Sequence, residues 1–126
     1  IGSAYPYENE ETVEIKGRNL ADGFPKNIIL TPQEIREALV DSIVSILDAI
    51  RSTLEKTPPE LSADIIDRGI TLTGGGAMLK GLDRLITIET GMPVHIAENP
   101  LDCVAMGAGR ILEVNYEHNE AVSDPA

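Results

Sequence analysis

The segment GITLTGGGAM, residues 69–78, joins a short apolar run to three consecutive glycines. Residues 69–73 predict a buried strand, and residues 74–76 predict a turn with uncovered backbone amides. An amphipathic helix is expected directly behind the turn, closed by Gly91. Amides and the positive end of a helix can bind an anionic group or a nucleotide, so the turn is a candidate ligand site. Glycines can also serve only to turn the chain, and the motif alone leaves both interpretations open.

Two well-known phosphate-binding signatures do not fit this turn. A Walker loop with the spacing Gly76 to Gly81 needs Lys followed by Ser or Thr, and Leu82-Asp83 stands there instead. The dinucleotide pattern needs a third glycine at position 79, where this chain has leucine. Any ligand is therefore held in another way.

The residues before the turn predict a hairpin and a long helix. Residues 12–16 alternate polar and apolar side chains, and residues 27–30 form a second β-like run, so the two are expected to pair. The sequence Thr31-Pro32-Gln33-Glu34 predicts a capped helix start. Apolar residues then recur every three or four positions to about Lys56, at Ile35, Leu39, Ile43, Leu47, Ile50 and Leu54. This stripe is interpreted as core, with a partner helix as the alternative.

Shorter elements complete the chain. Residues 60–66 predict a short helix and residues 93–97 a strand. Asn99-Pro100 predicts the start of a last helix, which could pack closely against a neighbour through its small residues Ala105, Gly107, Ala108 and Gly109. The polar, acidic residues from Asn115 onward predict a frayed tail. The order of strands and helices indicates an α/β layer with the hairpin as a smaller lobe.

Composition limits the classes of function. The chain has 126 residues, 42% of them hydrophobic and 25% charged, as expected for one globular domain. Its formal charge of −11 would repel nucleic acid and anionic lipid, so no nucleic-acid partner is expected. The single cysteine, the absence of metal-ligand spacing and the lack of a long apolar run favour the cytoplasm. The start at Ile1 rather than methionine suggests a fragment or a processed product.

Other chemically active side chains favour structural roles. His95 and His118 have no nucleophile or ligand set nearby in the sequence, so neither is expected to be catalytic. Cys103 is expected to be a small buried hydrophobic residue, although a helix dipole could activate it. The pair Glu10-Glu11 lacks the spacing of a calcium loop and is interpreted as a solvated edge.

The extended glycine segment GITLTGGGAMLKGLD, residues 69–83, resembles the MreB family of bacterial actin homologues. Further segments resemble that family in the same order, up to about residue 114: IGSAYP at 1–6, GRNL at 17–20, LEKTPPEL at 54–61, ETGMP at 89–93 and NPLDCVAMGAG at 99–109. The resemblance implies an α/β, actin-like (ribonuclease H-like) ATPase fold. It further implies that the chain is the C-terminal half of the second lobe with part of a small hairpin subdomain.

The resemblance also implies a division of the chain and a site. Residues 1–30 would be the hairpin portion of a small subdomain, residues 31–56 a linking helix, residues 57–114 the nucleotide-loop region and residues 115–126 a flexible acidic tail. Carried over residue by residue, Gly74, Gly75 and Gly76 become backbone contacts to ATP. Ala77 and Met78 become lining of the base pocket.

The activity implied by the resemblance is that of a cytoskeletal ATPase. Such a protein binds ATP with Mg²⁺, polymerises into membrane-associated cytoplasmic filaments and works with cell-shape and cell-wall synthesis proteins. The family's N-terminal phosphate loop, its second phosphate loop with the catalytic acids, its adenosine segment and its membrane-binding segment are not found here. No hydrolysis is therefore expected from this polypeptide alone. The alternatives are an interaction module without nucleotide, or another actin-superfamily protein such as a sugar kinase or a chaperone.

Overall fold

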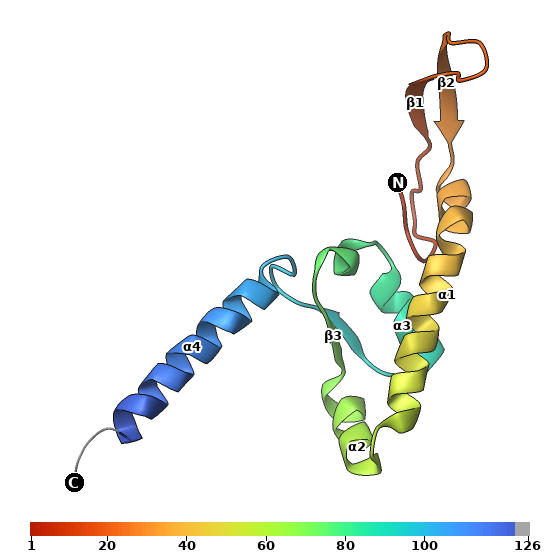
Figure 1. Cartoon of the computed structure of the whole chain (residues 1–126). Coiled ribbons are helices and arrows are strands. Elements are labelled where there is room, and N and C mark those ends of the chain that lie inside the picture. The colour runs from red at the N-terminus through yellow and green to blue at the C-terminus, as the bar shows by residue number, and fades with distance from the viewer. Residues whose placement is uncertain (123–126) are drawn as a thin grey trace.

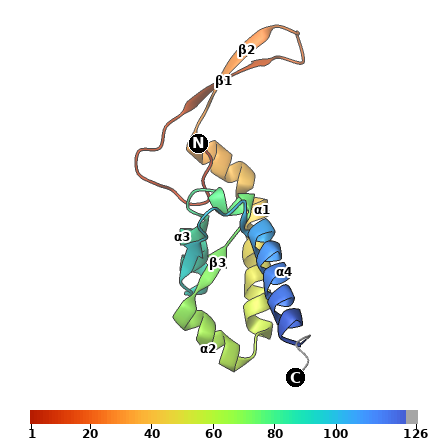
Figure 2. The same ribbon diagram turned by 90° about the vertical axis from the view of Figure 1, so that its left-hand side faces the viewer.

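A computed structural model of the chain describes residues 1–122, with side chains for residues 1–115. The N-terminal part forms an arm, in which β1 (Val13–Arg18) pairs antiparallel with β2 (Pro25–Leu30). The pairing runs from Val13 opposite Leu30 to Arg18 opposite Pro25 and confirms the predicted hairpin. The arm projects beyond the end of the long helix, away from the remaining elements (Figures 1 and 2).

The long helix α1 (Pro32–Lys56) begins and ends where its capping residues predict. The Thr31 hydroxyl accepts a hydrogen bond from the Glu34 amide, and the Glu34 carboxylate accepts one from the Thr31 amide, at 3.2 and 3.0 Å. These two bonds satisfy amides that the first helical turn cannot pair. Pro58 and Pro59 directly follow the C-cap residue Thr57 and prevent α1 from continuing. The next helix, α2 (Pro59–Arg68), begins there.

A second sheet lies beside α1 and holds the glycine turn. Strands β3 (Ile70–Leu72) and β4 (Val94–Ile96) pair in parallel, joined by the single 3-10 turn η1 (Gly75–Met78) and by α3 (Leu82–Thr90). Gly91 closes α3 in the left-handed conformation, as predicted. Both strands are therefore confirmed, within a residue or two of their predicted ends.

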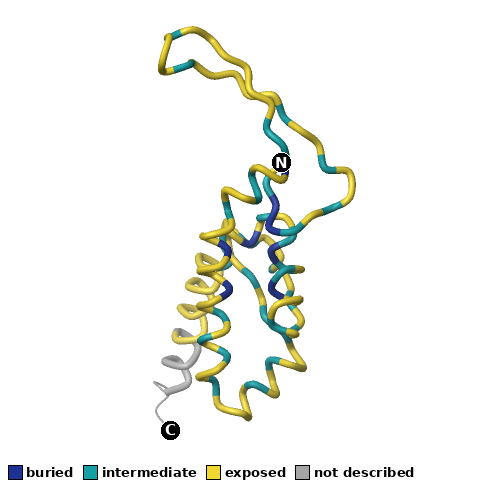
Figure 3. The backbone as a smooth tube through the Cα atoms, turned by 90° about the vertical axis from the view of Figure 1, so that its right-hand side faces the viewer, coloured by how far each residue is buried: buried dark blue, intermediate teal, exposed yellow. Residues whose placement is uncertain are grey.

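The core lies where α1, α3 and the N-terminal segment meet (Figure 3). Its buried members are Ala4, Ile43, Leu47, Leu82 and Ile86. The segment before the arm joins this core because Ser3 forms a parallel bridge with Lys80, and the Ala4 amide donates to the Lys80 carbonyl at 2.7 Å. Two members of the predicted apolar stripe of α1, Ile43 and Leu47, are thus buried. The stripe serves as core, although its ends are only half-buried.

The last helix, α4 (Cys103–Val122), departs from the sequence-based expectation at both ends. It does not begin at Pro100, because Asn99 adopts a left-handed conformation with φ of 49° and residues 100–102 form a turn. It also continues as a helix through Val122, past Asn115, where the polar sequence predicted a frayed tail. No glycine or proline interrupts residues 110–122, which explains the continuation. The predicted tail residues 123–126 lie outside the described part.

The small residues of α4 do not pack against a neighbouring element in the described part of the chain. Gly107 and Gly109 have no atom within 4 Å of an added Cβ, and α4 leads away from the body in Figure 1. The apolar side chains of its described part are exposed by 56–78%, namely Val104, Met106, Ile111, Leu112 and Val114. The close packing predicted for this helix is therefore not formed among the described residues.

Candidate functional site

The glycine turn follows the end of β3 directly. Gly74 has φ of 80° and ψ of 178°, a backbone conformation that residues with a Cβ atom rarely adopt. Its amide donates to the Pro100 carbonyl at 2.8 Å, which ties the turn to the chain that leads into α4. The sequence identified the turn, and this long-range hydrogen bond fixes its position.

The outer side of the turn is open. No atom lies within 4 Å of a Cβ built on Gly74 or Gly76, and a Cβ on Gly75 would touch only the Leu101 side chain at 3.5 Å. Among the described residues, the amides of Gly75 and Gly76 donate no hydrogen bond to a protein group. The amides that begin a 3-10 turn have no partner within the turn, so both can bind an external acceptor.

The expected contribution of a helix dipole is not realised in the predicted form. The glycines open η1, a single turn of four residues, and α3 starts only at Leu82. The first residue before α3 is Gly81, which lies against Tyr5 and not against the glycine turn. The individual amides of the turn, without a long helix behind them, are therefore the groups available to an anion.

Ala77 and Met78 occupy different environments. Ala77 is buried, with 4% of its surface exposed, and its amide donates to the Gly74 carbonyl at 3.3 Å. Met78 is 59% exposed and lines a hollow of about 240 Å³ beside the turn. Asn99, Pro100, Leu101 and Asp102 complete that lining. Met78 is thus placed to contact a ligand in the hollow, whereas the Ala77 methyl group faces the interior.

The charge around the hollow is low and negative. Asp102 is the one charged residue among those that line it. A phosphate group would consequently be bound by backbone amides, while the Asn99 and Asp102 side chains suit hydroxyl or amino groups. The sequence did not single out residues 99–102 as part of the site, because their approach to the turn depends on the parallel pairing of β3 with β4.

The remaining candidates lie outside this site. The Cys103 thiol donates weakly to the carbonyls of Asn99 and Glu98, and His95 lies on β4 beside Gly69. Within the described residues, no group of three or more His, Cys, Asp or Glu side chains could hold a metal ion. Glu10, interpreted as part of a solvated edge, instead forms an ion pair with Arg36. Among residues 1–122, no helix is both long and apolar enough to cross a membrane.

Solved structures define the class of fold to which this arrangement belongs. MreB5 of Spiroplasma citri bound to ADP superimposes with a TM-score of 0.88 at 36% identity, over 95% of this chain and 36% of that chain. The same protein bound to AMPPNP gives a TM-score of 0.87 over 96% of this chain. The chain therefore has a partial actin-like fold of the mixed α/β class.

Sequence relatives identify the family. A family model described as MreB/Mbl protein matches residues 1–120. The cell shape-determining protein MreB of Escherichia coli (strain K12) is 52% identical over 118 residues, which cover 94% of this chain and 34% of the relative. The cell shape-determining protein Mbl of Bacillus subtilis (strain 168) is 48% identical over 113 residues, 90% of this chain and 34% of the relative. The chain belongs to the MreB/Mbl family, and it spans about a third of the length of these relatives.

Proposed function

We propose that this chain is the nucleotide-contacting C-terminal portion of an actin-like cell-shape protein that binds ATP and polymerises into filaments. The names of the Escherichia coli and Bacillus subtilis relatives support a role in cell shape. The nucleotides bound to MreB5 of Spiroplasma citri support the choice of ligand. In this proposal the filaments lie in the cytoplasm at the membrane and guide proteins of cell-wall synthesis.

The open glycine turn is the observation that carries the proposal. Within the described part of the chain, the amides of Gly75 and Gly76 have no protein partner, and no side chain covers Gly76. In our proposal these amides donate to oxygen atoms of the nucleotide, and Met78 lies against its apolar part. Such contacts suit a nucleotide because phosphate and ribose oxygens accept hydrogen bonds while the base offers a flat apolar face.

This chain is proposed to supply only one wall of the nucleotide site. ATP is normally accompanied by Mg²⁺, and we assign no metal ligand or catalytic group to the described residues. Groups that orient the metal and the attacking water would come from the rest of the actin-like fold. The turn would thus contribute binding and orientation of ATP rather than the hydrolytic step.

Substitution of Gly76 in the full-length protein tests this proposal. Gly76→Ala adds a methyl group where no protein atom lies within 4 Å, and Gly76 does not have a positive φ, so the fold should tolerate the change. A nucleotide held at the backbone would clash with that methyl group. Gly76→Asp adds charge repulsion as well, and we expect affinity for ATP to fall by about tenfold or more, a cost of about 1.4 kcal/mol.

A matched control separates loss of contact from loss of fold. Gly17 is equally open, with no atom within 4 Å of an added Cβ, and it lies in β1, far from the turn. Gly17→Asp should leave calorimetrically measured ATP affinity unchanged. Equal affinity in the Gly76→Asp and Gly17→Asp proteins would refute the assigned contact and favour an interaction module without nucleotide.

A further inference from the structure

The arm formed by β1 and β2 is joined to the body through a narrow base. Among the described residues, no hydrogen bond or ion pair links residues 13–30 to any residue outside that range. The chain enters the arm through residues 7–12 and leaves it at Thr31. Within the described chain, the direction in which the arm points therefore depends on how these two connections are held.

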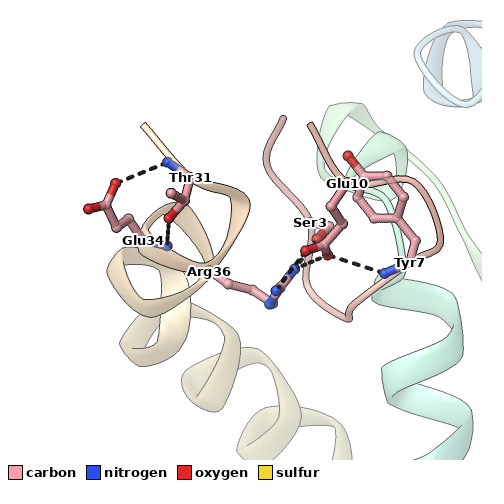
Figure 4. Close-up of polar contacts among 6 residues, drawn as sticks. All are labelled: Ser3, Tyr7, Glu10, Thr31, Glu34 and Arg36. Carbon is pink, nitrogen blue, oxygen red and sulfur yellow. Dashed lines mark hydrogen bonds and ion pairs between the residues drawn. The ribbon is translucent and has the colours of Figure 1, made fainter. Parts of the chain in front are cut away.

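Arg36, in the second turn of α1, binds both the body and the entering connection (Figure 4). Its guanidinium group donates to the Ser3 hydroxyl at 2.9 Å and to the two Glu10 carboxylate oxygens at 2.6 and 3.3 Å. Ser3 is completely buried, and the side chains of Arg36 and Glu10 are only 17% and 23% exposed. A bidentate, partly buried ion pair of this kind holds its two side chains in a defined relative position better than an exposed ion pair does.

The neighbouring contacts make Glu10 the last anchored residue before the arm. Its carboxylate also accepts a hydrogen bond from the Tyr7 amide at 3.2 Å, and the Lys80 ammonium group lies 5.1 Å from the centre of the Tyr7 ring. Residues 11 and 12 then lead directly into β1. On the leaving side, Thr31 is held by the capping bonds with Glu34, so the first turns of α1 anchor both connections (Figure 4).

We propose that Arg36 is a latch that fixes the angle between the arm and the body by holding Ser3 and Glu10 together. These contacts of Arg36 determine where the tip of the arm presents its exposed apolar side chains, Leu20 at 98% and Phe24 at 70% exposure. Arginine is suited to this role because its planar group binds two partners at once. A lysine at the same position lacks this planar fork, so it cannot bind both carboxylate oxygens through two parallel hydrogen bonds.

Distance measurements between spin labels test the latch directly. Labels are placed at Leu20→Cys on the arm and Ser42→Cys on the exposed side of α1, in the full-length protein with Cys103→Ser and any further cysteines replaced. We expect a narrow distance distribution in the parent. Glu10→Ala should broaden the distribution and shift its mean, and Arg36→Lys should give an intermediate width.

Glu89→Ala is the matched control. It removes one of the two acidic partners of another arginine on α1, Arg51, at a contact with α3 that lies away from the base of the arm. We expect the parent distribution in this variant. Broadening of equal size in the Glu10→Ala and Glu89→Ala proteins would show a general loosening and would overturn the latch.

Reversing the pair guards against loss of folding. Arg36→Glu combined with Glu10→Arg should recover a narrower distribution than either change alone, at unchanged circular dichroism. If the Arg36 variants do not fold, the Glu10→Ala protein provides the test. A spin-label distance distribution in Glu10→Ala identical to that of the parent would refute the latch. The measurement needs no nucleotide, so its outcome is independent of the proposed function.

Discussion

Two glycines at the ends of α3 share a left-handed conformation but have very different surroundings. Gly81 precedes the helix with φ of 78°, and a Cβ there would lie 2.9 Å from Tyr5 Cβ and 3.0 Å from the Tyr5 nitrogen. Gly91 follows the helix with φ of 71°, and nothing lies within 4 Å of its Cβ position. The first position therefore requires glycine for its contacts as well as for its backbone.

Alanine at these positions should separate the two requirements. Gly91→Ala should cost about 1–2 kcal/mol, the strain of a left-handed residue with a side chain. Gly81→Ala adds overpacking against Tyr5 and should cost about 3 kcal/mol in total. Urea unfolding of the two variants measures the difference. Equal losses of unfolding free energy in the two variants would mean that the close contact between Gly81 and Tyr5 does not contribute to stability.

Glu10 gives stability a dependence on pH with a definite sign. The hydrogen bonds from Arg36 are the main cause that lowers the Glu10 pKa below its ordinary value of 4.5. A carboxylate with a lowered pKa in the folded state stabilises the fold above its unfolded pKa, and that contribution disappears as pH falls through the folded value. Stabilisation by the Arg36–Glu10 pair is therefore complete at neutral pH.

The comparison of Glu10→Gln with the parent tests this sign. The difference in unfolding free energy should be constant at neutral pH and should shrink in acid, below the ordinary glutamate pKa of 4.5. Measurement of the unfolding midpoint over a pH series gives the curve. A difference that grows as the solution becomes more acidic would contradict the assignment.

At the scale of elements, local signals predicted most of the structure. The capping residues at Thr31 and Glu34 defined the start of α1, and the left-handed glycine at position 91 defined the end of α3. Both signals act through hydrogen bonds between residues that are close in sequence. The pairing of β1 with β2 followed from alternation of side chains, which is also a local property.

The failures arose where distant residues decide the conformation. Asn99-Pro100 matches a helix start, yet the Pro100 carbonyl accepts a hydrogen bond from Gly74, and the helix begins at Cys103. The glycines were identified as a ligand turn, but the neighbouring hollow was not, because residues 99–102 reach it only through the pairing of β3 with β4. Arg36 could not be linked to Ser3 and Glu10 from spacing alone, since 33 and 26 positions separate them.

At the scale of the whole molecule, the described chain leaves a large apolar surface uncovered. The exposed residues on α4 include Val104, Ile111 and Leu112, and this chain matches only about a third of the length of its relatives. Exposed apolar surface of this extent usually marks an interface. We expect the remainder of the full-length protein to cover α4.

Leu112→Lys should affect the isolated chain and the full-length protein in different ways. In the isolated chain of 126 residues, the change should increase the monomeric fraction, because Leu112 is 71% exposed there. In the full-length protein it should lower the melting temperature, because a charge would be placed in a covered surface. Light scattering after size exclusion and thermal unfolding measure the two effects. An unchanged melting temperature would show that α4 is not covered at this position.

The hydrogen bond from the Gly74 amide to the Pro100 carbonyl joins the glycine turn to the segment that leads into helix α4. Helix α4 has 20 residues and is therefore about 30 Å long at 1.5 Å per residue. A rotation of about 10° at its root would displace its far end by about 5 Å, by simple geometry of that length. A small displacement at the glycine turn can thus become a displacement of several ångströms at the C-terminal end of α4.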